Sequence, residues 1–188
     1  MSDTLVWEQF KSGDQSAFRQ IYGDHVDALI RYGMRFTKDA TLVEDAIHDL
    51  FVYLWQNRRG LSTTDSIRRY LLVATRRRII KKLQAQNKFS DTPPEDLPFQ
   101  AEVSIESTLI AEEWSAERKT KMEKAFQQLS KRQREALFLK YQHNMDYDEL
   151  CEAMDLNYQS ARNLVSGAIR KIRQYLDFWW LIIFLNLF

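Results

Sequence analysis

Apolar and polar residues alternate with a helical period near the C-terminal end of the chain. Between 158 and 176 the apolar residues recur every three or four positions and share one helix face: Ala161, Leu164, Val165, Ala168, Ile169, Ile172 and Leu176. Upstream, Asp146 and Glu149 form a capping-box pattern that opens a short helix over 147–154. A turn ends at Asn157, a good N-cap for the second helix. Together these features predict a helix-turn-helix.

The same period predicts helices throughout the N-terminal half. A short helix with Trp7 and Phe10 ends near Ser12-Gly13, and Asp14 caps a longer one. The apolar side of the longer helix comprises Ala17, Phe18, Ile21, Tyr22, Val26, Leu29 and Ile30. No segment shows strand alternation of useful length, so the predicted fold class is all-α.

Two further helices are predicted before residue 88. Thr41 and Glu44 suggest a capping box that opens a helix through Trp55, and Asp65 is expected to cap the next one. The first should bury Ala46, Ile47, Leu50, Phe51 and Leu54, and the second Ile67, Tyr70, Leu71, Ala74, Ile79 and Leu83.

Charge is segregated along the chain, although the formal net charge is only +1. The segment 66–88 is basic without an acid, whereas 89–113 is acidic without Lys or Arg and holds all three prolines. This pattern predicts two small helical domains, 1–88 and 114–177, joined by an acidic linker, 89–113. The linker is expected to contact a cationic surface. The alternative for the linker is a solvated spacer with ordinary surface charge.

Few residues are suited to enzyme chemistry. No glycine-rich phosphate loop or nucleophile elbow is present, and the three histidines lack metal-ligand spacing. We therefore expect no catalytic activity, cofactor or metal. The single cysteine, Cys151, is expected to be a small buried hydrophobe in a reducing cytosol, and the N-terminus lacks a signal-peptide pattern.

Two polar faces are candidates for binding. On the second helix of the helix-turn-helix, the side opposite the apolar face carries Gln159, Asn163, Ser166 and Arg170, with Arg162 and Arg173 at its edge. These side chains are suited to reading base edges in a major groove; the alternative is a merely polar surface. On the helix before Trp55, a mixed acidic and apolar patch could bind a protein, or be an ordinary solvated face: Asp45, His48, Asp49 and Val52.

Three segments together resemble a known family. They are Val43-Glu-Asp-Ala-Ile-His-Asp-Leu-Phe51 with Trp55, Leu129-Ser-Lys-Arg-Gln-Arg-Glu135, and Tyr147 to Met154 followed by Asn157 to Leu164. In this order and spacing the chain resembles a group IV, or extracytoplasmic-function, sigma factor of bacterial RNA polymerase. The resemblance covers nearly everything from Trp7 to Leu176.

The resemblance implies partners and site residues. The patch at Asp45, His48, Asp49 and Val52 would bind the clamp helices of core RNA polymerase. The loop 57–64 would capture a flipped base of the minus-ten element, and the basic helix 66–83 would hold its phosphates. The residues implied at this element are Asn57, Arg58, Arg59, Arg69, Arg76, Arg77, Arg78 and Lys81. The helix-turn-helix would read duplex promoter DNA at the minus-thirty-five element through Tyr158, Gln159, Ser160, Arg162, Asn163, Ser166 and Arg170.

The resemblance implies that the protein recognises both promoter elements, melts the promoter and starts transcription in the cytoplasm. It also allows for an anti-sigma factor as a partner. Two alternatives stay open. One is a helix-turn-helix regulator that acts without promoter melting, and the other is an adaptor that binds polymerase without opening DNA.

The last eleven residues, 178–188, form an apolar tail that contains Trp179 and Trp180. As a helix the tail would be roughly 16 Å long, too short for a bilayer core of about 30 Å. A peripheral membrane contact or docking onto protein are the two interpretations of this segment.

Overall fold

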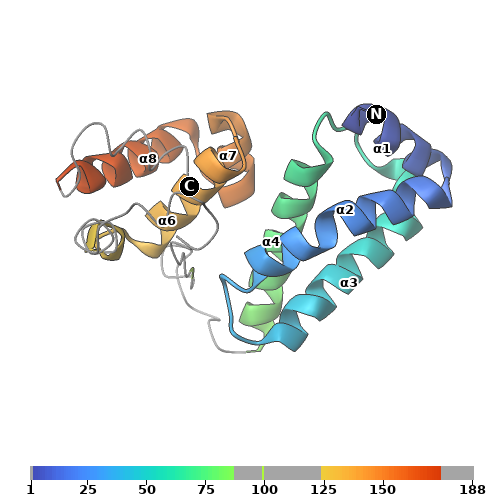
Figure 1. Cartoon of the computed structure of the whole chain (residues 1–188), viewed down its shortest axis with the longest axis horizontal. Helices are drawn as coiled ribbons and strands as arrows, with labels where there is room; N and C mark the ends of the chain where they lie inside the picture. The colour runs from blue at the N-terminus through green and yellow to red at the C-terminus, as the bar shows by residue number, and fades with distance from the viewer. Residues whose placement is uncertain (1, 87–98, 100–123, 175–188) are drawn as a thin grey trace, which may run out of the picture. The chain divides into compact units, whose positions relative to one another are not determined.

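The computed structural model describes residues 2–86, 99 and 124–174 (Figure 1). Over these residues the chain forms helices, turns and irregular loops but no strand, so the predicted all-α class is confirmed. The chain divides into two compact units, Met1–Thr92 and Pro93–Phe188. In the described part no helix has the length and apolarity needed to cross a bilayer.

The first unit is built from α1 (Asp3–Ser12), α2 (Gln15–Gly33), α3 (Ala40–Asn57) and α4 (Ile67–Ala85). The three long helices α2, α3 and α4 pack against one another, and α3 runs antiparallel to its two neighbours (Figure 1). The short helix α1 packs on α2 and also contacts α4. A 3-10 turn, η1 (Arg58–Gly60), follows α3 directly.

The sequence correctly predicts the first two boundaries of this unit. Helix α1 ends at Ser12, and Gly13 adopts the left-handed conformation (φ 103°) that glycine accepts without strain. Asp14 then caps α2, because its carboxylate accepts hydrogen bonds from the backbone N–H groups of Ser16 (2.7 Å) and Ala17 (3.4 Å).

Two predicted caps are wrong. The cap of α3 is Asp39, whose side chain accepts from the Leu42 N–H at 3.0 Å, so this helix begins before Thr41. The cap of α4 is Ser66, because the Asp65 carboxylate pairs with Arg69 at 2.5 Å instead. In both places several residues capable of capping lie close together, and the path of the incoming chain selects among them.

The core of the first unit agrees with most of the predicted apolar faces. The prediction is wrong for Tyr22 of α2, which is 45% exposed with its ring 4.8 Å from that of Phe51. All five residues expected to point inward from α3 are buried, as are Ile67, Leu71, Ile79 and Leu83 of α4. The helices lie close together at Gly33, where an added Cβ would lie 2.5 Å from Val43 Cγ1 and 2.8 Å from Ile79 Cδ1. The missing side chain of Gly33 therefore permits α2 to lie against both α3 and α4.

The described part of the second unit contains α6 (Lys131–Leu137), η4 (Phe138–Gln142), α7 (Tyr147–Met154) and α8 (Tyr158–Arg173). Segment η4 continues α6 as one turn of π-helix. Ser130 and Gln133 form a reciprocal capping box at the start of α6. Helix α8 packs on both α6 and α7, so its apolar face is covered by the two preceding helices.

The predicted helix-turn-helix is confirmed in its elements. Asp146 and Glu149 form the expected capping box of α7, with donor–acceptor distances of 2.7 and 2.8 Å. The Asn157 side chain accepts from the Ser160 N–H at 2.8 Å and caps α8. Between the helices, Asp155 takes the left-handed conformation (φ 53°) and ends α7.

Other predictions fall outside the described residues. They concern most of the acidic linker 89–113, the apolar tail 178–188 and the burial of Leu176. Within the described part, Phe99 is buried and its ring lies 5.8 Å from that of Phe138. Cys151 is half-buried, and burial raises the pKa of its thiol, which favours the neutral form expected of a packing residue.

Candidate nucleic-acid and partner interfaces

The outer side of α3 carries the predicted patch for a protein partner. Asp45, His48, Asp49 and Val52 are all exposed, because the apolar residues between them point into the core. Val52 is 38% exposed. The patch therefore combines negative charge with an exposed apolar side chain, and both kinds of group occur in protein interfaces.

Asp49 of this patch has a partner within its own unit. The Lys82 ammonium of α4 donates to Asp49 Oδ2 at 2.8 Å. This hydrogen bond lowers the pKa of the Asp49 carboxyl, and the charges of Lys82, His48 and Arg78 act in the same direction. Asp49 is therefore ionised at neutral pH, and Lys82 neutralises part of the negative charge of the patch.

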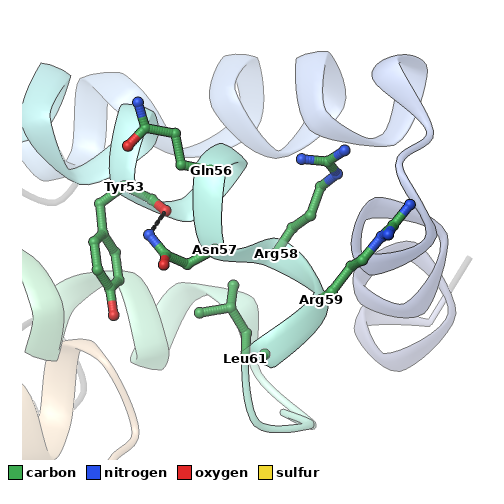
Figure 2. Close-up of a pocket in the computed structure, with 7 residues that line it drawn as sticks. Tyr53, Gln56, Asn57, Arg58, Arg59 and Leu61 are labelled. Atoms are coloured by element: carbon green, nitrogen blue, oxygen red, sulfur yellow. Dashed lines mark hydrogen bonds between the residues drawn. The ribbon is translucent and has the colours of Figure 1, made fainter.

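A pocket of about 510 Å³ lies where α3 ends and η1 begins (Figure 2). Its lining comes from one continuous stretch of chain and is mostly polar: Tyr53, Gln56, Asn57, Arg58, Arg59, Gly60 and Leu61. The Asn57 amide donates to the Tyr53 carbonyl oxygen at 2.9 Å, which leaves the Asn57 side-chain oxygen available to a donor. A hollow of this size that offers acceptors and cationic donors can hold a planar polar group such as a base.

The two arginines of η1 have different surroundings. Arg58 is half-buried: its guanidinium lies 4.5 Å from the Trp55 ring centre and donates to the Trp55 carbonyl oxygen at 2.6 Å. Arg59 is exposed. The position of Arg59 therefore fits the predicted contact with nucleic acid, whereas Arg58 is engaged in packing against Trp55.

The basic residues predicted along α4 also differ in exposure: some are exposed, and others are partly or fully buried. Arg77 and Lys81 are exposed, as a contact with a DNA phosphate requires. Arg78 is half-buried, with its guanidinium 4.8 Å from the Tyr53 ring centre, and Arg69 pairs with Asp65. Arg76 is only 5% exposed, so its burial does not fit the predicted contact with DNA. A run of arginines in a helix necessarily places some of them inward, and the apolar pattern did not identify Arg76 as one of these.

The recognition face predicted on α8 is exposed except at Ser160. Helix α8 buries Ala161, Val165, Ala168 and Ile172, and the opposite side presents Gln159, Arg162, Asn163, Ser166 and Arg170. Tyr158, at the start of the helix, is 49% exposed, and its ring lies 5.7 Å from that of Tyr147 in α7. Ser160 is half-buried and its backbone N–H is used by the Asn157 cap.

Three features of these surfaces were not predicted. Tyr53 and Gln56 line the pocket, and Lys82 pairs with Asp49. The two pocket residues lie within one turn of Asn57, so the loop boundary could have been extended backward to include them. The Lys82–Asp49 pair joins two helices, and nothing in a single sequence specifies which residues of neighbouring helices meet.

Comparison with known protein families gives a match for each of the two units. Residues 21–89 match the model "Sigma-70 region 2", and residues 119–172 match "Sigma-70, region 4". The first match contains α3, the pocket and α4, and the second contains the helix-turn-helix. The fold and the two surfaces therefore define a chain with regions 2 and 4 of sigma-70.

Similar proteins match over most of the chain. The chain is 24% identical over 182 residues to the ECF RNA polymerase sigma factor SigK of Mycobacterium ulcerans (strain Agy99), covering 94% of this chain and 95% of the relative. It is 24% identical to SigL of Mycobacterium tuberculosis (strain ATCC 25618 / H37Rv) over 61% of this chain and 72% of the relative. The solved structure of CnrH in complex with the cytosolic domain of CnrY has a similar fold, with a TM-score of 0.55, 19% identity and coverage of 93% and 97% of the two chains.

The chain belongs to the extracytoplasmic-function sigma factors of bacterial RNA polymerase. Members of this family are DNA-binding initiation factors that recognise promoters. This family assignment agrees with the resemblance found in the sequence.

Proposed function

We propose that this sigma factor binds core RNA polymerase, reads both promoter elements and melts the minus-ten element itself. The pocket at the end of α3 is the observation that carries the proposal, because most of its lining belongs to the loop 57–64 that is expected to capture a flipped base. Extruding a base from the duplex costs a few kcal/mol, which contacts to the extruded base must offset. The exposed Arg59 and the free Asn57 oxygen supply such contacts at the pocket.

The other surfaces have complementary roles in this proposal. The exposed patch on α3 binds the polymerase clamp through Asp45, His48, Asp49 and Val52. Arg77 and Lys81 of α4 neutralise phosphates beside the pocket, and α8 lies in the major groove of the minus-thirty-five element. Phosphate contacts position the strand, and base contacts in the pocket and on α8 provide sequence preference.

Partner proteins follow from the same assignment. Core RNA polymerase and promoter DNA are the partners of the proposed reaction. The structure of CnrH with the cytosolic domain of CnrY supports a further protein partner, an anti-sigma factor, for a chain of this fold. Such a partner would compete with core polymerase for this chain, which a competition assay with the three purified proteins measures.

Run-off transcription on two templates tests promoter melting. The templates share one promoter, which is fully duplex in the first and carries a mismatched, already open minus-ten region in the second. We expect Arg59→Ala to reduce transcripts from the duplex by roughly ten- to 150-fold, because a hydrogen bond from a charged group contributes roughly 1.5–3 kcal/mol. On the open template, where no base has to be unstacked, we expect a much smaller loss.

Two control variants show whether an effect of Arg59→Ala is specific to the pocket. Arg19→Ala removes an exposed arginine of α2 outside the proposed surfaces and should leave transcription from both templates unchanged. Asp45→Arg with Asp49→Arg should abolish transcription from both, since polymerase binding is lost. Equal losses from both templates with Arg59→Ala would contradict base capture. Duplex binding without a polymerase-dependent transcript would instead identify a conventional regulator.

A further inference from the structure

Two side chains on the exposed face of α8 are joined to each other. Gln159 Nε2 donates a hydrogen bond to Asn163 Oδ1 at 3.0 Å, and both residues are exposed one helical turn apart. Ser166, on the same face, donates instead to the backbone oxygen of Asn163 at 3.2 Å. The hydrogen bond between the two side-chain amides therefore does not involve the Ser166 side chain.

The pair determines which hydrogen-bonding groups remain available. A carboxamide has two N–H donors and one oxygen with two lone pairs. Gln159 has used one N–H, so its oxygen and its second N–H remain. Asn163 has used one lone pair of its oxygen, so both of its N–H donors remain. Gln159 therefore presents one acceptor and one donor, while Asn163 presents mainly donors.

We propose that Gln159 and Asn163 read two neighbouring base pairs of the minus-thirty-five element as one unit. Gln159 accepts from adenine N6 and donates to adenine N7, which is the bidentate pattern that a glutamine amide matches in the major groove. Asn163 positions the Gln159 amide and donates to an acceptor of the next pair, either thymine O4 or guanine O6 and N7. This inference rests on the proposed function, in which α8 lies in that groove.

The hydrogen bond acts by orienting Gln159 before DNA arrives. An unrestrained glutamine on a helix surface samples several rotamers, and binding must select one of them. Asn163 restricts that choice, so losing Asn163 weakens a base contact that Asn163 does not itself make. The preference for adenine at the Gln159 position is consequently shared between two residues.

Selection from a promoter library tests this coupling. The full chain with core polymerase binds duplex promoters randomised through the minus-thirty-five element, and the bound DNA is sequenced. We expect one position with a strong preference for adenine, which Gln159→Ala reduces by roughly five- to 150-fold, the range for a bidentate contact. Asn163→Ala should reduce the adenine preference at that same position and also the preference at the next one.

A conservative variant separates positioning from direct contact. Asn163→Asp retains an oxygen that accepts from Gln159 but has no N–H, so it should keep the adenine preference and lose the neighbouring one. Gln174→Ala is the control: it removes a carboxamide from an exposed residue at the C-terminal end of α8, outside the proposed base contacts, so the adenine preference should stay unchanged.

Three results would overturn the coupling. The first is an adenine preference that Asn163→Ala leaves intact, and the second is a double variant whose effect equals the product of the two single effects. The third is a Gln159→Ala variant with unchanged base preference. If the wild-type complex shows no base preference in the minus-thirty-five element, the proposed role of α8 is wrong. The coupling of Gln159 and Asn163 is then rejected together with that role.

Discussion

At the residue scale, the Lys82–Asp49 pair links the exposed patch on α3, which we propose binds polymerase, to the basic helix α4. Because Lys82 lowers the pKa of Asp49, the stabilisation from this pair is present above the ordinary pKa of an aspartate and is lost as the pH falls through the lowered value. We expect Lys82→Gln to raise the pKa of Asp49 toward its ordinary value, which an NMR titration of the carboxyl carbon measures.

The neighbouring lysine provides the control for this titration. Lys81→Gln removes the same charge from an exposed position next to Lys82. Because Lys82 remains able to donate to Asp49, the pKa of Asp49 should change little in this variant. An equal rise in both variants would mean that the general positive charge of α4, and not the hydrogen bond, sets the acidity of Asp49.

Exposure of single residues could be predicted only in part. The patch on α3 and the face of α8 followed from helical periodicity, because each lies opposite a continuous apolar stripe. Periodicity did not predict the burial of Arg76 or the contact of Arg58 with Trp55. An arginine can bury its guanidinium against an aromatic ring or a carbonyl group, and its partner comes from packing that the pattern of apolar positions does not contain.

At the scale of elements, two glycines of α2 make a matched pair. An alanine Cβ at Gly33 would meet Val43 and Ile79 of the neighbouring helices, whereas nothing lies within 4 Å of the same atom at Gly23. We expect Gly33→Ala to lower the free energy of unfolding by about 1–3 kcal/mol through overpacking. Gly23→Ala should raise it by roughly 0.5–1 kcal/mol, since alanine is the better helix former. Urea unfolding of both variants checks the two signs.

A loss of stability in both variants would show that α2 tolerates no alanine for some reason other than packing. A gain in both would show that α2 can shift away from α3 and α4 at little cost. The contrast between the two glycines is therefore the informative result, because both changes add the same methyl group to the same helix.

Most elements were predictable, and the errors concern where helices begin. Periodicity and capping patterns predicted α2, α7 and α8, because each has a suitable cap beside a clear apolar stripe. Helix α1 was predicted from its apolar residues and its end at Gly13, since its N-cap Ser2 makes no side-chain hydrogen bond. The starts of α3 and α4 were misplaced because Thr41 and Asp65 each have a competing cap, Asp39 and Ser66, close by in the chain. Helix α6 has a capping box of the usual S-x-x-Q form at Ser130, a signal that the sequence contains and that could have been used.

At the scale of the whole molecule, a chain of net charge +1 has little general attraction for DNA. Its affinity should therefore depend on local cations such as Arg77. We expect Arg77→Gln to weaken binding of the holoenzyme to all promoters alike and to reduce the slope of log affinity against log salt by about 0.9, the value for one lost phosphate contact. Titrations at several salt concentrations with two promoters of different sequence measure both effects.

The matched control for the salt titration is Arg19→Gln, at an exposed arginine of α2. It removes one charge from the molecule without removing a proposed phosphate contact, so the slope should stay the same. A change of slope in both variants would assign the effect to net charge. A variant of Arg77 that alters preference among promoters would place this residue at a base.

The close approach of three helices at Gly33 has a consequence for recombining sigma factors. Gly33, Val43 and Ile79 occupy one crossing point although they come from three separate stretches of sequence. A hybrid whose junction separates α2 from α3 or α4 would join helices from different parents whose side chains were never matched at this point. Productive shuffling between family members should therefore exchange the segment 15–85 as a single block, and natural hybrids should have their junctions outside it.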